Sequence, residues 1–327
     1  MMKIENVDIK NRIVLAPMAG YTNRSYRKIM KEMGVGLLYS EMISARGLVY
    51  QNDKTIELTK VEDAEHPISL QIFGGDIESL VEAAKFIDTK TNADIIDINM
   101  GCPVRKVLKA NAGSSLLKDP KFIGEIVREV KSNVSKPVSI KIRAGLDHTS
   151  INAVEVAKEA EKAGAALIAV HGRTKSDLYR GSVNLDYIKQ VKENVNIPVI
   201  GNGDIKTIED AKRMFEYTNV DFIMVGRGSL GNPWLIRDLV DYFSGKPLKS
   251  GPTPLERINM CEKHFSYLLE EKIEKLAVLE MRSLAAWYLK GIKNLKQYKQ
   301  KLITLTKKEE LYSLFNEIRE GILNYEN

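Results

Sequence analysis

The feature that most constrains the fold is an alternation of short apolar runs with amphipathic stretches, repeated eight times before residue 246. The runs are rich in Val and Ile and nearly continuously hydrophobic, as strands buried on both faces of a parallel sheet are. We expect strands at Ile13–Pro17, Gly36–Ser40, Ile68–Phe73, Ile95–Asn99, Val138–Ile142, Leu167–Val170, Val199–Gly201 and Phe222–Val225. This alternation predicts an α/β fold, a (β/α)8 TIM barrel. An open doubly wound sheet is the alternative, but the pattern shows no switch and so favours closure.

Helix boundary signals lie between these runs. Asp76–Thr89 follows a Gly-Gly-Asp turn, and Asn152–Ala163 ends before Gly164, so both segments are predicted helices. Asp119-Pro120 supplies an N-cap followed by Pro at the first helical position. Thr207–Asp210 is close to a capping box. Each strand is therefore expected to be followed by a helix.

The pattern changes near residue 246. Gly245–Pro254 is rich in Gly, Pro, Ser and Lys, which is typical of a linker. Thr253 and Glu256 then form a capping box, and only helical periodicity follows as far as Asn327. We predict a barrel domain over residues 1–245 and a small helical domain over residues 246–327.

Composition places the chain among globular proteins, with 44% hydrophobic residues and a mean hydropathy of −0.22. No apolar run reaches the roughly 18 residues of a membrane span, and the N-terminus lacks a signal-peptide pattern. We therefore expect a cytoplasmic protein that makes no membrane contact. We also expect a monomer, although nothing in the sequence fixes the oligomeric state. Cys102 and Cys261 lie far apart, and the four histidines fit no metal spacing, so neither a disulfide nor a metal site is expected.

Polar and small residues gather where the predicted strands end. In a (β/α)8 barrel the active site is built from the loops at these ends, so the residues there are site candidates. They include Pro17, Met18, Ala19, Gln71, Asn99, Cys102, Lys141, Arg143, His171, Arg173, Asn202, Gly203, Asp204, Gly226 and Arg227. A polar group at nearly every strand end is difficult to explain by loop capping alone.

The last two of these loops, Gly201–Asp204 and Gly226–Gly228, are Gly-rich and each leads into a helix. Small residues let backbone N–H groups approach an anion, and these loops are the usual phosphate site of the fold. We expect a phosphorylated cofactor there. Gly226–Gly231 also matches G-x-G-x-x-G, but a linker follows instead of a second βαβ unit, so a Rossmann dinucleotide fold is not expected.

Two residues could carry chemistry in more than one way. Cys102 lies in a turn that faces the presumed site, and a thiol near its free pKa of about 8.5 can act as a general acid at pH 7. As a nucleophile it would need a base, and His171 could be that base. Lys141, inside a strand, could form a Schiff base or contact an electron-rich cofactor ring.

Taken together, these segments resemble the bacterial tRNA-dihydrouridine synthase family, and within it most closely the B-type subfamily. The matching segments follow in order as Ala16–Gly20, Gln71–Gly74, Asp97–Pro103, Gly113–Leu117, Lys141–Gly145, His171–Thr174, Gly201–Asp204 and Gly226–Gly228. The family usually has Thr-Asp-x-Pro after the first segment. This chain has Asn23 in place of that Asp, which removes a charge from a loop beside the cofactor.

The resemblance implies a reductase that saturates the C5=C6 bond of uridine in tRNA, with FMN as cofactor and NADPH or NADH as reductant. Contacts with FMN are implied for Pro17, Met18, Ala19, Gln71, Lys141, His171, Asn202, Gly203, Asp204, Gly226 and Arg227. Cys102 would be the proton donor. Contacts with the substrate nucleotide are implied for Asn99, Arg143, Arg173 and Tyr179.

The helical domain carries the charge expected of an RNA surface. From Arg282 to Lys308 it has eight basic residues and no acidic one, with aromatic residues interleaved. We expect tRNA contacts from Arg282, Lys290, Lys293 and Lys296. A solvated Lys face over core aromatics is the simpler interpretation, and Trp287 by itself is expected in the core.

Three other functions stay open at this stage. One is an FMN barrel that acts on a small molecule, like a dihydroorotate dehydrogenase or an enoate reductase, and the basic helical domain argues against it. Another is a flavin-free lyase or aldolase that uses Lys141. The third is a non-catalytic RNA-binding protein, which Cys102 and Lys141 in a cofactor site make difficult to sustain.

Overall fold

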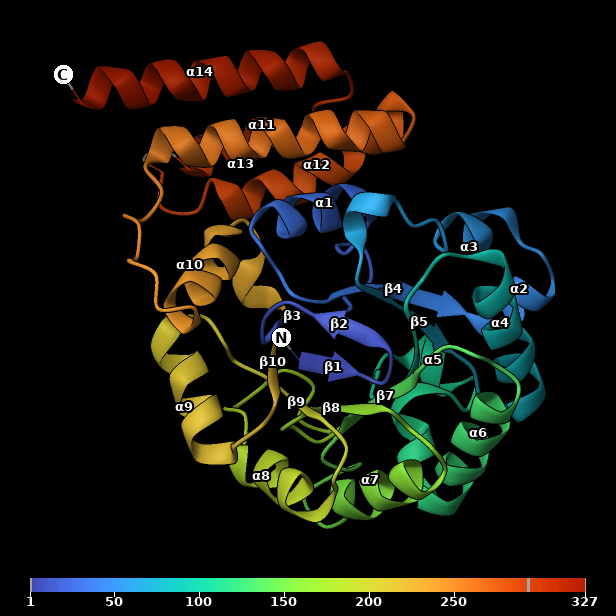
Figure 1. The fold of residues 1–327 in the computed structure, drawn as a ribbon. Coiled ribbons are helices and arrows are strands. Elements are labelled where there is room, and N and C mark those ends of the chain that lie inside the picture. The colour runs from blue at the N-terminus through green and yellow to red at the C-terminus, as the bar shows by residue number, and fades with distance from the viewer. Residues whose placement is uncertain (1, 293–294, 327) are drawn as a thin grey trace.

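A computed structural model describes residues 2–292 and 295–326. Eight parallel strands in the order β3-β10-β9-β8-β7-β6-β5-β4 form its main sheet (Figure 1). The strands are β3 (Ile13–Leu15), β4 (Leu38–Ser44), β5 (Ile68–Phe73), β6 (Ile95–Met100), β7 (Val138–Arg143), β8 (Leu167–His171), β9 (Val199–Asn202) and β10 (Phe222–Val225). The Leu15 amide donates to the Leu37 carbonyl at 2.9 Å, which joins the two ends of the sheet. The predicted TIM barrel is confirmed.

Helices surround the barrel. They are α1 (Arg24–Glu32), α4 (Ile77–Lys90), α6 (Pro120–Ser132), α7 (Ala153–Lys162), α8 (Leu185–Asn194), α9 (Ile208–Thr218) and α10 (Trp234–Phe243), with the shorter α2 (Ala45–Val49), α3 (Asp53–Glu57), α5 (Arg105–Leu108) and the 3₁₀ turns η1 (Asp63–Glu65), η2 (Gly113–Lys118) and η3 (Arg227–Ser229). The predicted caps are present, because Asp119 accepts from the Phe122 amide and Thr207 forms a capping box with Asp210.

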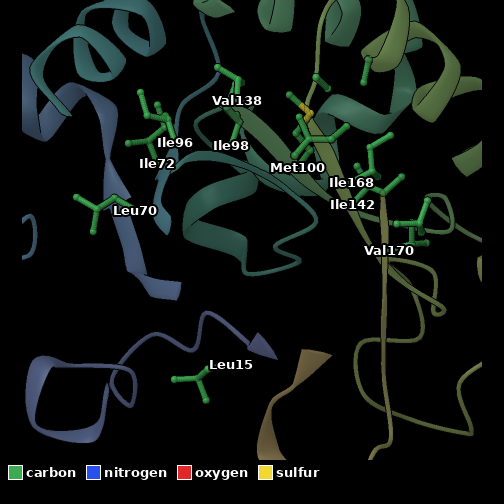
Figure 2. Close-up of a cluster of buried hydrophobic side chains, with 14 of the residues drawn as sticks. Leu15, Leu70, Ile72, Ile96, Ile98, Met100, Val138, Ile142, Ile168 and Val170 are labelled. Atoms are coloured by element: carbon green, nitrogen blue, oxygen red, sulfur yellow. The ribbon is translucent and has the colours of Figure 1, made fainter. Parts of the chain in front are cut away.

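Alternate residues of the strands face the barrel interior and the surrounding helices. On β10, Phe222 and Met224 belong to the apolar cluster inside the barrel, whereas Ile223 and Val225 belong to the layer between sheet and helices. Figure 2 shows part of that layer. Because both faces of every strand are covered, the runs are apolar throughout.

A hairpin missed by the sequence analysis closes the N-terminal end of the barrel. Its strands β1 (Met2–Ile4) and β2 (Val7–Ile9) pair antiparallel (Figure 1). Ile4 and Ile9 are buried and join the apolar cluster inside the barrel. Three-residue strands give too short a pattern to be recognised.

The C-terminal residues form a helical tail, defined as α11 (Pro254–Glu271), α12 (Glu274–Tyr288), α13 (Leu295–Leu302) and α14 (Lys308–Glu326). It has its own apolar cluster, and α11 packs against α1 of the barrel. The expected boundary at residues 245 and 246 falls between α10 and α11 and stays a prediction. None of the helices in the described part of the chain is long and apolar enough to span a bilayer.

Candidate active site

A cavity of about 400 Å³, hereafter the main cavity, opens at the C-terminal ends of the barrel strands. Most of the predicted site residues line it. They are Pro17, Met18, Ala19, Asn99, Cys102, Lys141, Arg143, His171, Tyr179, Asn202, Gly203, Asp204, Gly226 and Arg227. Residues that lie up to 210 positions apart in the sequence therefore share one site, since Pro17 and Arg227 both face it.

One wall of the main cavity is apolar. Ala16 to Ala19 form it directly after β3, and Met224 of β10 adds its side chain from the interior. The Met18 amide donates to Thr22 Oγ1 at 3.0 Å, which fixes the turn that carries this wall. A smooth apolar wall of this kind suits a flat ring system.

Lys141 of β7 places a partly buried amine in the main cavity. Its Nζ donates to Asn202 Oδ1 at 3.0 Å, and Asn202 Nδ2 donates to the Met224 carbonyl at 2.8 Å. Burial, together with the positive charge of Arg143, lowers the pKa of Lys141 to about 8. Since its hydrogen-bond partner is a neutral amide, the ammonium would gain stability from an anionic ligand.

Gln71 does not line the main cavity and lies in a buried polar layer beneath it. Its Nε2 donates to Asp97 Oδ2 at 2.6 Å, and its Oε1 accepts from Asn99 Nδ2 at 2.8 Å. Burial raises the pKa of Asp97 to about 6. In this arrangement Gln71 orients Asn99, and its direct contact with a cofactor stays a prediction.

The turn that carries Cys102 is held from three sides. Asn99 Oδ1 accepts from the Cys102 amide at 2.9 Å, and Arg143 Nε donates to the Gly101 carbonyl at 2.9 Å. The Ser114 amide donates to the Cys102 carbonyl at 3.0 Å. The neighbouring Gly113 has φ +62, and a Cβ there would lie 2.7 Å from that carbonyl oxygen, so a larger residue would displace the turn.

Burial raises the pKa of the Cys102 thiol, against the opposing effect of Arg143 and Lys141, so the thiol is protonated at neutral pH. His171 is neutral as well, because burial and the charges of Lys141 and Arg143 hold its pKa well below the usual range. The same environment disfavours a thiolate–imidazolium pair. The site therefore favours the general-acid interpretation of Cys102 over the nucleophilic one.

Charged groups converge at the loops after β9 and β10. Arg173 Nη2 donates to Asp204 Oδ2 at 2.6 Å, and Arg227 Nη2 lies 3.9 Å from Asp204 Oδ1. Burial opposes ionisation of Asp204, but the hydrogen bonds from Arg173 and the Val183 amide outweigh it and lower its pKa. Arg173 lies outside the lining of the main cavity and orients Asp204, and its contact with the substrate nucleotide stays a prediction.

Tyr179 lies over the edge of the main cavity and is 56% exposed. The guanidinium carbons of Arg227 and Arg143 lie 4.5 and 5.5 Å from its ring centroid. Arg143 also donates to the Leu178 carbonyl at 2.8 Å, so it fixes both this loop and the Cys102 turn. Arg143 is thus a cavity residue whose hydrogen bonds are already made to the backbone.

The expected core position of Trp287 is wrong. This residue, near the end of α12, is 36% exposed and lines the main cavity, so the helical tail contributes to the site. Gly231 touches its backbone, because a Cβ at Gly231 would lie 2.3 Å from the Trp287 carbonyl carbon. Tyr288 and Tyr298 are buried in the tail, against the expectation of a basic and aromatic surface there. Helical periodicity alone could not separate Trp287 from these neighbours.

The basic residues of the tail divide into two groups. Lys290 and Lys296 are exposed, whereas Lys301 pairs with Glu317 at 2.6 Å and Arg282 donates to backbone carbonyls of the tail itself. Lys293 lies outside the described residues. Part of the predicted basic surface is therefore already compensated by charges or carbonyls within the chain.

The chain is a (β/α)8 barrel whose site combines an apolar wall, a partly buried amine and a buried thiol. The fold is shared with a solved structure of histamine dehydrogenase from Rhizobium sp. 4-9, with a TM-score of 0.57 and 16% identity over 81% of this chain and 50% of that one. The dihydrouridine synthase family model matches residues 14–323. This chain belongs to the dihydrouridine synthase family.

Curated relatives match over nearly the whole chain. The tRNA-dihydrouridine synthase B of Pasteurella multocida is 40% identical over 325 residues, which cover 99% of this chain and 96% of that protein. The enzyme of the same name from Pseudomonas aeruginosa is 38% identical, with 91% and 90% covered. A probable tRNA-dihydrouridine synthase of Rickettsia conorii is 36% identical, again with 91% and 90% covered.

Proposed function

We propose that this protein reduces the C5=C6 bond of specific uridines in tRNA to give 5,6-dihydrouridine, with FMN as cofactor and NADPH or NADH as reductant. The observation that carries the proposal is the buried thiol of Cys102 in the same cavity as Lys141 and the apolar wall. Membership of the dihydrouridine synthase family defines the reaction. We also propose that the protein is cytoplasmic and monomeric.

The residues present fit FMN. The wall from Ala16 to Ala19 suits the flat ring system, and Lys141, with an amide as its hydrogen-bond partner, suits a ring that becomes anionic on reduction. Arg227, half-exposed beside the loops after β9 and β10, suits the phosphate. Bound FMN would supply the hydride that reduces C6 of uracil.

Cys102 supplies the proton that completes the reduction. As C6 is reduced, negative charge develops at C5 and O4 of the pyrimidine, and the Sγ–H of Cys102 donates its proton to C5. Lys141 and Arg143 stabilise the thiolate that is left, since their charges oppose the rise in its pKa. The thiol regains its proton from solvent at the mouth of the cavity. Asn99 and Arg143 keep Cys102 in place by holding its turn.

The test is reduction of an unmodified tRNA transcript by the purified protein with FMN and NADPH, followed by mass spectrometry. A gain of two hydrogens on specific uridines is expected, and the protein should show the absorbance of a bound flavin. A protein that stays colourless when FMN is offered would rule out the proposal. So would a protein that oxidises NADPH with orotate or an enoate but leaves tRNA unchanged.

A further inference from the structure

The loop after β10 is held from behind by two buried hydroxyl groups. Tyr26 Oη donates to Ser229 Oγ at 2.9 Å, and Ser229 Oγ donates to the Gly226 carbonyl at 2.8 Å. The Ser229 amide donates to the same carbonyl at 3.0 Å. A serine hydroxyl has one proton to donate and lone pairs to accept with, so the three groups form one directed series of hydrogen bonds. Tyr26 and Ser229 are both buried, so water is not at hand to replace these bonds.

The carbonyl at the end of this series belongs to a tightly packed part of the main cavity. Gly226 lines the cavity beside the apolar wall, where a Cβ on it would lie 3.4 Å from Ala16 Cβ. Two residues further on, a Cβ at Gly228 would lie 2.2 Å from the Ile205 carbonyl oxygen in the loop after β9. The direction of the Gly226 peptide therefore determines how the loop meets the wall on one side and the β9 loop on the other.

The ring of Tyr26 is fixed by its neighbours without help from its hydroxyl. Tyr26 lies in the first turn of α1, which lies between the barrel and α11 of the helical tail (Figure 1). Its ring centroid is 5.7 Å from that of His264 on α11, and His264 Nδ1 is hydrogen-bonded to Tyr288 Oη at 3.1 Å. A phenylalanine ring would pack in the same way. The contribution peculiar to tyrosine is the bond to Ser229, and this bond leads to the loop after β10.

That loop has a specific task on the function proposed above, because Arg227 and the backbone beside it suit the phosphate of FMN. We propose that Tyr26 is a positioning residue for this phosphate, an inference that rests on the proposed function. Through Ser229 it fixes the Gly226 carbonyl, and with it the direction in which Arg227 and the following backbone face the cavity. Tyr26 lies outside the lining of the main cavity, so it acts only through the loop.

Riboflavin separates binding of the flavin ring from binding of the phosphate, because it is FMN without the phosphate. The full-length protein is titrated with FMN or with riboflavin, and quenching of flavin fluorescence gives each Kd. Tyr26→Phe should raise the Kd for FMN about three- to tenfold, as expected for the loss of one buried hydrogen bond, with little change for riboflavin. Ser229→Ala should have the same effect. Because both substitutions break one series, Tyr26→Phe/Ser229→Ala should bind FMN no more weakly than the weaker of the single variants.

Tyr288→Phe is the matched control, because it removes an equally buried hydroxyl whose bond is to His264 and not to the loop. It should lower the unfolding temperature and leave the ratio of the two Kd values at its wild-type value. If Tyr288→Phe changes that ratio as much as Tyr26→Phe does, the effect belongs to the packing of the tail and the inference is wrong.

Three results with the other variants would also overturn the inference. They are an unchanged Kd ratio in Tyr26→Phe, equal rises for FMN and riboflavin, and additive losses in the double variant. A wild-type protein that binds neither flavin would instead refute the proposed function, and this inference with it. The two failures are distinguishable, because the first three results require a wild-type protein that binds FMN.

Discussion

The main cavity and the helical tail use their polar residues in different ways. In the cavity, Lys141, Asn99 and Arg143 each have defined hydrogen-bond partners, so their polar atoms are oriented before a ligand arrives. In the tail, Lys290 and Lys296 are exposed and extend into solvent. Chemistry at one carbon atom requires fixed geometry, whereas attraction of a polyanion requires only charge at the right surface. The two regions therefore should respond differently to mutation.

The sharpest test of this difference is Cys102→Ala. If the cavity performs the chemistry and the tail binds RNA, this variant should retain FMN and tRNA affinity but lose about 10²- to 10⁴-fold in the rate of uridine reduction. Single-turnover mass spectrometry of the tRNA measures the rate, and filter binding measures the affinity. Cys261→Ala is the control, since Cys261 is buried in the tail away from the cavity. Undiminished turnover would remove Cys102 from the mechanism.

Trp287 lies where the main cavity and the helical tail meet. Its replacement therefore tests whether RNA binding is confined to the tail and chemistry to the cavity. We expect an RNA base to stack on this exposed ring at the cavity edge, and such stacking contributes about 1–3 kcal/mol. Trp287→Ala should raise the KM for tRNA by roughly 10- to 100-fold without changing flavin reduction by NADPH. Trp287→Phe should keep most of the affinity. Equal KM values for all three proteins would show that the ring only covers the cavity.

Charge reversal in the tail should affect binding alone. Lys290→Glu/Lys296→Glu should weaken tRNA binding about tenfold at moderate salt and reduce the salt dependence of binding, because fewer counterions are released. The rate at saturating tRNA should not change. Arg128→Glu/Lys162→Glu makes the same change of charge on exposed residues of the barrel helices α6 and α7. Equal losses in both double variants would indicate a general effect of net charge.

The barrel could be predicted from the sequence because a strand buried on both faces is apolar at every position. The site could be located because a barrel brings all strand ends to one face. The sequence could not show how deep in the barrel each polar strand residue lies. Gln71 lies beneath the cavity and Asn99 lines it, although both are polar residues of predicted strands. Strand β4 extends to Ser44, past the expected Ser40, because its pairing with β5 resumes at Met42 after a register shift and continues to Ser44. The position of Trp287 depends on how the tail docks, which no local pattern encodes.

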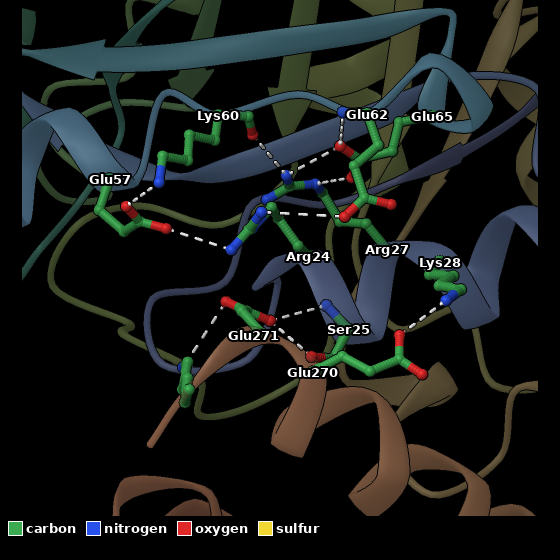
Figure 3. A network of polar contacts seen from close by, with 11 residues as sticks. Arg24, Ser25, Arg27, Lys28, Glu57, Lys60, Glu62, Glu65, Glu270 and Glu271 are labelled. Atoms are coloured by element: carbon green, nitrogen blue, oxygen red, sulfur yellow. Dashed lines mark hydrogen bonds and ion pairs between the residues drawn. The ribbon is translucent and has the colours of Figure 1, made fainter.

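Polar contacts with α1 and the loop before it help to dock the tail on the barrel, beside the apolar packing of Tyr21 and Met260 against both clusters. Glu271 accepts from the Ser25 amide at 3.0 Å, and Glu270 pairs with Lys28 at 3.0 Å (Figure 3). Asn23 adds a contact beside them, since its Nδ2 donates to Glu280 Oε2 at 3.1 Å. The resemblance described above implies an Asp at this position, and the Asn23 amide is what allows a bond to a carboxylate.

The smallest expected effect is that of Asn23→Asp on stability. This substitution tests whether the barrel and the helical tail depend on the bond between Asn23 and Glu280. Aspartate can still cap α1, as Asn23 does through the Tyr26 amide, but it places a second carboxylate against Glu280. Because Lys272 already pairs with Glu280 at 2.6 Å and offsets part of the repulsion, we expect a loss of about 1 kcal/mol in unfolding free energy. Thermal unfolding at low and high salt measures it, and the loss should shrink at high salt. Glu280→Gln in the same chain should restore stability, since the amide can again donate. If Asn23→Asp is as stable as the wild type at low salt, the two regions do not depend on this bond, and the departure from the family has no role in joining them.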